Sequence, residues 1–285
     1  MSYARKTCVV VCAMVAMLAL APQAQATLIA WYNMEQSASP LVDQAGGQTA
    51  VTNGGGGDLY QQAGVPAGTY GALTLANTTG YAVGMSNTAT QWNLSVADSA
   101  ELNLTNNFTA MAWIYLPATP TASDDQAKGI IGLGTAWIGQ GWDLGVRHAA
   151  GKEGISFTMA GQADYLSGDV IDWTGGAWHH VAATKSSTGG INLYLDGNLS
   201  KTYSGATGNV TAMDASHYMS IGRMFNDART STIGERVDEI RVYDTVLTQT
   251  EISAAAIEGV PEPSTLALLV TGLLGLLAYA WRKRK

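Results

Sequence analysis

Two carboxylate side chains on the same face of a strand could cleave a glycosidic bond. One would act as the acid and the other as the base or nucleophile, at a fixed separation across the bond. Asp238 and Glu239 are adjacent in the sequence. Neighbouring side chains on a regular strand point to opposite faces. We therefore expect that these two residues cannot act together as such a pair.

The four histidines raise two further kinds of chemistry. His179 and His180 could ligate a metal, but neighbours on a strand face opposite ways and no third ligand lies at a suitable spacing. A Ser-His-Asp set would need a strained turn that exposes its serine, and the sequence contains no Gly-x-Ser-x-Gly. We expect structural roles for both histidines.

Tryptophans are the candidate ligand contacts. Three lie in predicted strands and are expected in the core: Trp31, Trp113 and Trp178. Four others lie in or beside loops rich in glycine and polar residues: Trp92, Trp137, Trp142 and Trp173. An indole in a rigid loop offers an apolar platform for a sugar ring, so Trp137, Trp142 and Trp173 are predicted to bind ligand. The alternative is that a loop tryptophan folds back and covers the edge of the domain.

The elements that must position these residues are short strands. Alternating apolar residues predict strands over residues 108–116, 178–184 and 191–195. Asp196-Gly197 suits the positive φ angles of a type I′ turn, so residues 198–203 should return as the hairpin partner. Shorter strands are predicted at residues 27–33, 129–134, 142–147, 155–159 and 218–222.

One short helix is predicted near the end of this region. The sequence Thr248-Gln-Thr-Glu251 has the pattern of a capping box. It should open a helix over residues 249–257 that Gly259 closes. Many short strands and a single helix predict a β-sandwich.

Residues 260–285 form three consecutive parts. Prolines hold residues 260–265 extended, because each fixes its own φ and disfavours helical geometry in the residue before it. The uncharged apolar run 266–281 would span about 24 Å as a helix, slightly less than a hydrocarbon core about 30 Å thick. The basic residues 282–285 should stay on the cytoplasmic side of a membrane. Everything before residue 260 is therefore expected outside the inner membrane.

The motif Pro261-Glu262-Pro263, the apolar run and the basic end together resemble the PEP-CTERM sorting signal of Gram-negative bacteria. The resemblance implies recognition by an exosortase, removal of the tail, and export to the cell surface or to an extracellular polysaccharide matrix. It also implies a precursor that is anchored in the inner membrane. The alternative is an ordinary C-terminal membrane anchor in which the three residues occur by chance.

Residues 1–26 have the pattern of a secretory signal peptide. A basic start precedes the apolar stretch 9–21, and Ala24-Gln25-Ala26 supplies the small residues of a signal-peptidase site. We expect the mature chain to begin at Thr27. Both cysteines lie in the removed segment, so disulfides cannot stabilise the exported domain.

The remaining residues, 27–259, are strongly acidic. The whole chain has 15 Lys and Arg against 22 Asp and Glu, and six of the basic residues lie in the two terminal signals. Such a surface repels nucleic acid, and the glycine runs lack the patterns of nucleotide-binding loops. The length suffices for one all-β domain with a large core.

Several segments of this region, in their order, carry a resemblance to a known fold. They are residues 30–35, 108–114, 178–182, 193–197, 221–223 and 234–243, followed by Leu247 and Glu251-Ile252. Together they resemble the laminin G type of concanavalin A-like domain, and they imply an all-β jelly-roll sandwich of about a dozen strands over residues 27–259. The fold serves lectins, glycanases, lyases and adhesive spacers alike, so it implies no ligand. The Glu-x-Asp-x-x-Glu strand of its glycanases does not occur here, and no catalytic residue is predicted.

Asp238 shares a predicted strand face with Ile240 and Val242, which places its carboxylate among inward apolar side chains. A buried charge needs a partner. Some members of the resembled fold hold a structural Ca²⁺ where the first and last strands meet, and Glu35 or Asp43 could join Asp238 in such an oxygen-rich site. The alternative is that Asp238 only accepts backbone hydrogen bonds at a strand end.

The sequence therefore predicts an exported cell-surface or matrix protein whose single domain binds or scaffolds without catalysis, with polysaccharide as the expected partner. Signal peptidase, an exosortase and, transiently, the inner membrane are the other expected partners, and nucleic acid is not. Two alternatives stay open. One is a polysaccharide-degrading enzyme with an atypical site, and the other is a purely structural matrix component.

Overall fold

A computed structural model describes residues 26–257 apart from several segments between strands. The segments left out are 54–58, 85–92, 98, 117–127, 136–138, 150–151, 169–175, 214–217 and 224–235. The terminal residues 1–25 and 258–285 also lie outside the described part. The predicted signal peptide and sorting signal are therefore not described.

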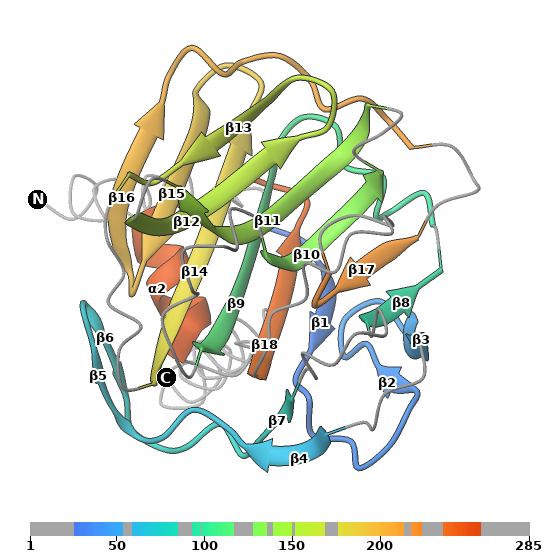
Figure 1. Ribbon diagram of the computed structural model, residues 1–285, viewed down its shortest axis with the longest axis vertical. Helices are drawn as coiled ribbons and strands as arrows, with labels where there is room; N and C mark the ends of the chain where they lie inside the picture. Colours follow the sequence, from blue (N-terminus) through green and yellow to red (C-terminus); the bar gives the residue numbers. More distant parts are fainter. Residues whose placement is uncertain are drawn as a thin grey trace, which may run out of the picture.

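Two eight-stranded antiparallel sheets and a two-stranded hairpin form the domain (Figure 1). The rear sheet runs in the order β16 (Asn198–Tyr203), β15 (Gly190–Leu195), β14 (Ala177–Ser186), β9 (Phe108–Leu116), β18 (Arg236–Tyr243), β7 (Tyr81–Gly84), β4 (Leu59–Ala63), with β1 (Leu28–Tyr32) also paired to β18. The front sheet runs in the order β13 (Ala163–Leu166), β12 (Lys152–Met159), β11 (Gln140–Ala149), β10 (Lys128–Thr135), β17 (Met219–Ile221), β8 (Asn93–Val96), β3 (Thr49–Asn53), β2 (Leu41–Val42). The hairpin consists of β5 (Gly68–Tyr70) and β6 (Leu73–Leu75).

The main core lies between the two sheets, as the predicted sandwich requires. Alternate residues of each strand face inward, and the largest side chains meet near the middle. Phe108 of the rear sheet lies 4.9 Å from the Trp142 ring of the front sheet, and Trp142 stacks on Phe157 of the next strand. These three rings are all fully buried. The all-β jelly-roll prediction is confirmed.

Local signals placed several elements correctly. The strands β9 and β16 have the predicted bounds, and the turn between β15 and β16 has positive φ at Asp196 (49°) and Gly197 (77°). The helix α2 (Gln249–Ile257) begins with the predicted capping box. In it Thr248 N donates to Glu251 Oε2 at 2.7 Å, and Glu251 N donates to Thr248 Oγ1 at 3.3 Å.

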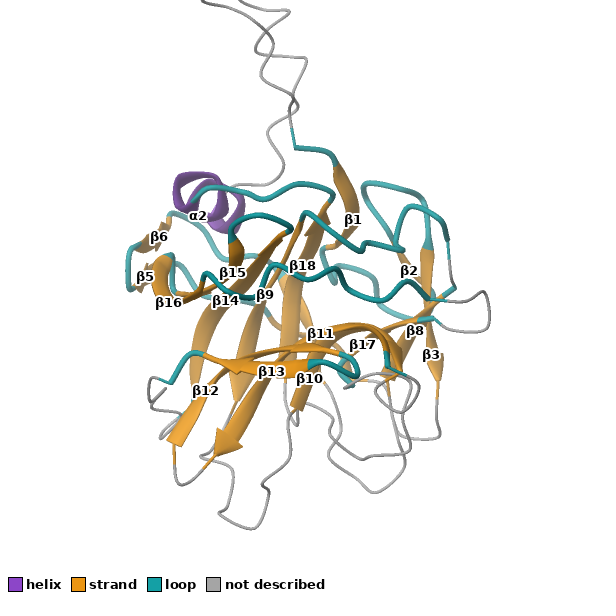
Figure 2. Cartoon of the chain, turned by 90° about the horizontal axis from the view of Figure 1, so that it is seen from above, coloured by secondary structure: helices purple, strands orange, loops and turns teal. Residues whose placement is uncertain are grey.

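Helix α2 packs on the outer face of the rear sheet, away from the front sheet (Figure 2). Its buried residues Ile252 and Ala255 contact Met111 and Tyr243, which point away from the main core. The indole Nε1 of Trp113 donates to the carbonyl of Ala256 at 3.0 Å. The domain therefore has three layers, which are the helix, the rear sheet and the front sheet.

A β-bulge in β18 overturns the predicted facing of Asp238. The pairing with β9 shifts between Asp238 and Arg241, and Glu239 has a φ of 49°. Val237, Ile240 and Val242 belong to the main core, whereas Asp238 is the partner of Trp113 on the outer face. The prediction that Asp238 shares the inward face was wrong, because the extra residue of the bulge reverses the alternation.

Candidate functional site

A row of polar residues crosses the outer face of the front sheet. On β11 the side chains of Trp142 and Leu144 enter the core, so Asp143 between them points outward. Its cross-strand partners are Gly132 on one side and Thr158 on the other. Continuing these pairings across six strands gives the polar row: Asp164, Thr158, Asp143, Gly132, Ser220 and Ser95.

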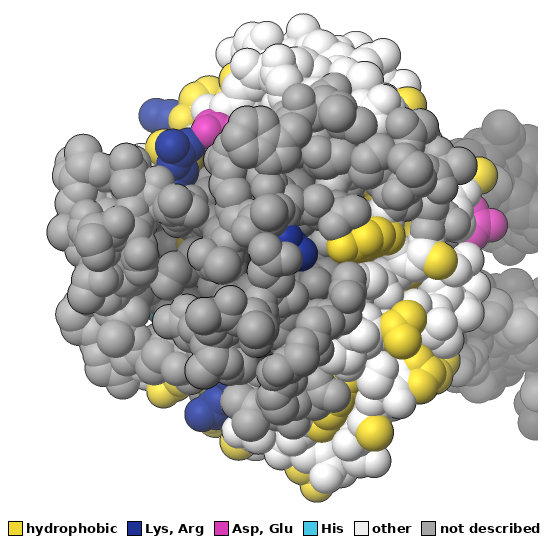
Figure 3. All heavy atoms as spheres, turned by 45° about the vertical axis from the view of Figure 1, so that its right-hand side comes forward, with side chains coloured by type: hydrophobic (Ala, Val, Ile, Leu, Met, Phe, Trp, Pro, Cys, Tyr) yellow, Lys and Arg dark blue, Asp and Glu magenta, His cyan; other side chains and the backbone are white. Residues whose placement is uncertain are grey.

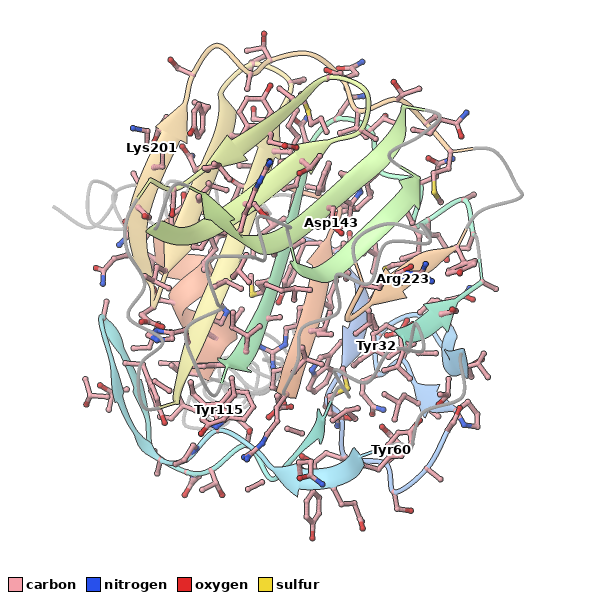
Figure 4. The ribbon with its side chains drawn as sticks, in the orientation of Figure 1. Tyr32, Tyr60, Tyr115, Asp143, Lys201 and Arg223 are labelled. Atoms are coloured by element: carbon pink, nitrogen blue, oxygen red, sulfur yellow. The ribbon has the colours of Figure 1, made fainter. Side chains whose placement is uncertain are left out.

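The row depends on glycine next to Asp143. A Cβ on Gly132 would lie 2.3 Å from Asp143 Oδ2, so the carboxylate occupies the space that any other residue would fill. Asp143 itself is 1% exposed. In Figure 4 it stands on the front sheet, with Arg223 beside β17 of the same sheet. Because residue 132 is a glycine, the Asp143 side chain lies over the neighbouring strand β10 and is not exposed at the surface.

Asp164 at one end of the row is held by two partners. Arg147, from β11, forms an ion pair with Asp164 Oδ2, and Thr158 Oγ1 donates to Asp164 Oδ1 at 2.8 Å. Both Arg147 and Asp164 are partly exposed. This network orients the carboxylate and the guanidinium at the edge formed by β12 and β13.

Other polar atoms near the row are buried and lack a hydrogen bond. Ser220 is 0% exposed and Ser156, on β12, is 1% exposed. Within the described part of the chain, Ser220 Oγ, Ser156 Oγ and Arg223 Nε have no hydrogen-bond partner. A buried polar group without a partner costs about 1–3 kcal/mol. Such groups are the ones that a hydroxyl-rich ligand can satisfy, so this face suits recognition of a polar ligand.

Of the three predicted ligand-binding tryptophans, the structure describes Trp142 alone. Trp142 lies inside β11 and is 1% exposed, between Phe108 and Phe157. Its predicted role as an exposed platform was wrong, because β11 begins earlier than the flanking glycines suggested. Trp137 and Trp173 lie outside the described residues. The alternation of residues 142–147 held the signal for Asp143 and Arg147, which the sequence reasoning passed over.

Asp238 forms a second polar cluster, on the outer face of the rear sheet. It is 0% exposed, and it accepts hydrogen bonds from the Thr79 hydroxyl and from Glu239 N, the latter at 2.8 Å. Burial raises the pKa of the Asp238 carboxyl well above its usual range, and the negative charges of Glu239 and Glu35 raise it further. The two hydrogen bonds lower the pKa, with smaller effects than burial and the Glu239 charge.

Of the other predicted calcium ligands, only Glu35 lies close enough to act on Asp238. Its Oε1 accepts the backbone N–H of Tyr81 at 3.0 Å. Asp43 instead closes its own loop, because its carboxylate accepts the N–H groups of Trp31, Ala45 and Gly46 at 2.7–2.9 Å. Among the described residues, no three His, Cys, Asp or Glu side chains are placed to hold a metal ion. Among the described residues these three carboxylates therefore do not form a three-ligand group, and calcium binding stays a prediction.

His179 and His180 point to opposite faces of their strand and have different surroundings. His179 Nδ1 lies 2.8 Å from Asp196 Oδ2, in the turn that follows β15. His180 is fully buried beside Trp113, with the two rings edge to face at 5.3 Å. Burial, with a smaller effect of the Arg241 charge, lowers the pKa of His180 to about 3. His180 is therefore neutral at physiological pH and packs as a core residue.

Figure 3 shows one side of the molecule. Among the described side chains visible there, apolar and uncharged ones predominate, and the few charged ones are scattered.

Two families match the chain. Residues 88–253 match the Concanavalin A-like lectin/glucanases superfamily. Residues 259–285 match the PEP-CTERM protein-sorting motif, which indicates export and sorting to the cell surface in Gram-negative bacteria. No curated protein matches the chain. In the described part of the chain, no helix is long and apolar enough to cross a membrane, and residues 266–281 lie outside that part.

Solved structures with a similar fold include domain 4 of AbnA, an extracellular GH43 arabinanase from Geobacillus stearothermophilus, in complex with arabinotriose. It has 17% identity and a TM-score of 0.55, with 81% of this chain and 99% of that chain covered. The binding domain of Paraclostridial Mosquitocidal Protein 1 has 13% identity and a TM-score of 0.51, covering 80% and 51%. Trypanosoma rangeli sialidase has 14% identity and a TM-score of 0.51, covering 83% and 33%. At these identities the similarity shows the fold alone.

Proposed function

The chain belongs to the concanavalin A-like lectin/glucanases superfamily, and on that premise we propose that its domain is a non-catalytic module that binds polysaccharide at the cell surface or in the surrounding matrix. The observation that carries the proposal is the polar row, with the buried hydroxyl of Ser220 in the row and that of Ser156 near it on β12. A polysaccharide supplies closely spaced hydroxyls that can both donate and accept. Neighbouring strands are about 4.8 Å apart, so the row offers polar groups over about 24 Å, enough for an extended chain.

Trp137 and Trp173 stay in this proposal as candidate aromatic contacts for the same ligand. Each stands in a segment that adjoins a front-sheet strand in sequence, Trp137 between β10 and β11 and Trp173 after β13. An indole that stacks on a sugar ring would add apolar contact to the hydrogen bonds of the row.

A polysaccharide screen with the domain 27–259 tests the proposal. Arabinan belongs in the first panel, because the AbnA domain was solved with arabinotriose. We expect retarded migration in native gels that contain the recognised polymer, with no release of reducing ends. A folded domain that binds none of the polymers would favour the purely structural matrix component.

Processing is tested separately. We propose that an exosortase removes the tail at the Pro261-Glu262-Pro263 motif, which the sorting-motif match contains. Intact-mass measurement of the surface protein should show a chain that starts near Thr27 and lacks residues 266–285. A surface protein that retains residues 282–285 would show that the tail is a permanent anchor.

One observation favours a second candidate, a polysaccharide-degrading enzyme. Asp143 and Asp164 lie on the same outer face, two strands apart with Thr158 between them. Two strand spacings are about 9.6 Å, near the upper end of the separation between the carboxyls of inverting glycosidases. The ion pair with Arg147 already engages Asp164 Oδ2 and so opposes a role of that oxygen in the reaction. Release of reducing ends that Asp143→Asn abolishes would establish the enzyme.

A further inference from the structure

The two ends of the described domain meet on one side of the molecule. Ala26 and Leu28 pack against the cluster that joins helix α2 to the rear sheet. Thr27 N donates to Asp244 Oδ1 at 3.0 Å, and Asp244 N donates to the carbonyl of Thr27 at 3.1 Å. The start of the mature chain and the last helix therefore share the outer layer of the rear sheet.

Helix α2 is firmly attached at its C-terminal end. Ala255 and Ala256 are both buried against the rear sheet. The 3.0 Å hydrogen bond from Trp113 Nε1 to the Ala256 carbonyl fixes the last turn. The point at which the chain leaves the domain, Ile257, is thus a fixed point on this outer layer and not the end of a loose segment.

Very little chain separates this fixed point from the sorting signal. The motif match begins at residue 259, so a single residue lies between it and Ile257. The apolar run begins at residue 266, and a fully extended chain of nine residues reaches about 30 Å. A domain of this length has a radius of gyration of about 17 Å, which corresponds to a width of about 45 Å. The tether is therefore shorter than the domain is wide.

The polar row lies on the opposite side of the molecule. The order of layers is α2, rear sheet and front sheet, and the row occupies the outer face of the front sheet (Figure 2). A tether shorter than the width of the domain cannot let that face swing round to the membrane. The tether of about 30 Å thus favours orientations of the anchored precursor in which the α2 layer, and not the front sheet, faces the lipid.

We infer that the outer layer formed by helix α2 and residues 26–28 is a membrane-apposed face, which lies against the phospholipid headgroups of the inner membrane until the tail is removed. The front sheet then points away from the membrane, so that ligand can bind before processing. This inference rests on the proposed membrane-anchored precursor but not on carbohydrate binding. It also places Pro261, the first residue of the motif, within about 14 Å of Ile257 and Pro263 within about 21 Å, so the processing enzyme must work near the α2 layer.

Site-specific fluorescence quenching tests the inference on the full chain. The sequence has two cysteines, Cys8 and Cys12, both in the predicted signal peptide, and serine would replace them. One new cysteine is placed at a time, Thr250→Cys on α2 or Gln162→Cys next to β13. Both positions are exposed. The motif Pro261-Glu262-Pro263 is changed to alanines so that the tail remains.

The labelled chains are reconstituted in phospholipid vesicles that contain a headgroup nitroxide quencher. We expect quenching at position 250 to be at least threefold stronger than at position 162, and both to fall to background for the domain 27–259 without its tail. Equal quenching at the two positions, or stronger quenching at position 162, would overturn the inference. Because the readout is distance to lipid, a failure of polysaccharide binding leaves it unchanged, and the two proposals fail separately.

Discussion

The hydroxyl of Thr79 joins Asp238 to a segment 159 residues away in the sequence. It accepts the backbone N–H of Val65 at 2.8 Å, so its proton is free to go to the carboxylate of Asp238. The same contact closes the segment 65–79, where Val65, Leu73 and Leu75 cover Trp113. A buried carboxyl thus links the last strand to the hairpin that covers the rear sheet.

The ionisation of Asp238 should make stability depend on pH. Its pKa is raised in the folded state, so the folded chain binds the proton more tightly than the unfolded chain, where the pKa is about 3.9. The free energy of unfolding should therefore be highest below about pH 4 for this group and should decline as pH rises through the raised pKa. Urea unfolding of the unmutated domain and of Asp238→Asn between pH 4 and 9 measures this, and the variant should lack that part of the decline.

The surface variant Asp244→Asn is the control for the Asp238 experiment, because Asp244 is exposed near the end of the same strand. It should keep the decline of the unmutated domain. An unchanged slope in Asp238→Asn would show that Asp238 is already charged in the folded state across this range.

His180 should affect the stability of the domain at acid pH. Its pKa is about 3 in the folded state and about 6.5 when unfolded. The unfolded chain therefore gains the proton first, and the stability contributed by neutral His180 is lost as pH falls from about 6.5 towards 3. The NMR chemical shifts of the His180 ring should show no titration between pH 8 and 5. A midpoint near 6.5 would contradict the buried, neutral state.

Calcium should have little effect through Asp43 and Asp238. Asp43 already accepts three backbone N–H groups, whose positive ends oppose a cation, and burial raises the pKa of the Asp238 carboxyl. We expect the melting temperature of the domain 27–259 to change by less than about 1 °C when EDTA is added. A drop of several degrees, of the size that a bound ligand at 100 times its Kd would produce, together with loss of this drop in Asp238→Asn, would restore the calcium site.

Trp142 should contribute to the stability of the domain and should not contact the ligand directly. Its ring packs between Phe108 and Phe157, and removal of a buried aromatic side chain costs about 3–5 kcal/mol. Trp142→Ala should lower the free energy of unfolding by that amount. Trp142→Phe should retain a folded domain with unchanged affinity for polysaccharide. Weaker binding by Trp142→Phe at unchanged stability would return Trp142 to the ligand site.

Sequence reasoning succeeded where the signal is local. The alternation of residues 108–116 and the Asp196-Gly197 turn are complete within a few neighbours, and both have the predicted structure. It failed at Glu239, because the bulge there arises from pairing with Trp113 and Met111, which lie more than a hundred residues away. No pattern within β18 reveals it.

The misplacement of Trp142 has a related cause. Glycines at 139 and 141 suggested a loop, yet β11 begins at Gln140. A Cβ on Gly141 would lie 1.6 Å from the carbonyl oxygen of Leu133. Glycine is required there by the close approach of two strands and not by a turn. The polar row was missed for the same reason, since its order follows from cross-strand register, which a single sequence does not display.

The position of Asp143 should be sensitive to its glycine neighbour. An alanine at Gly132 would meet Asp143 Oδ2 at 2.3 Å and push the carboxylate away. We expect Gly132→Ala to weaken polysaccharide binding about as much as Asp143→Ala, with the domain still folded by circular dichroism. Full affinity in Gly132→Ala would mean that the place of Asp143 on the row is unimportant for the ligand.

The affinity of the folded domain for its polysaccharide, measured when the polar row is altered, tests whether the outer face of the front sheet binds ligand. Asp143→Ala and Ser220→Ala should each raise Kd, by about tenfold if the lost hydrogen bonds are worth about 1.4 kcal/mol. Thr74→Ala, an exposed change on β6 beside the rear sheet, should bind like the unmutated domain. Equal affinity in all four proteins, measured by titration calorimetry, would contradict the assignment of the front sheet as the binding face.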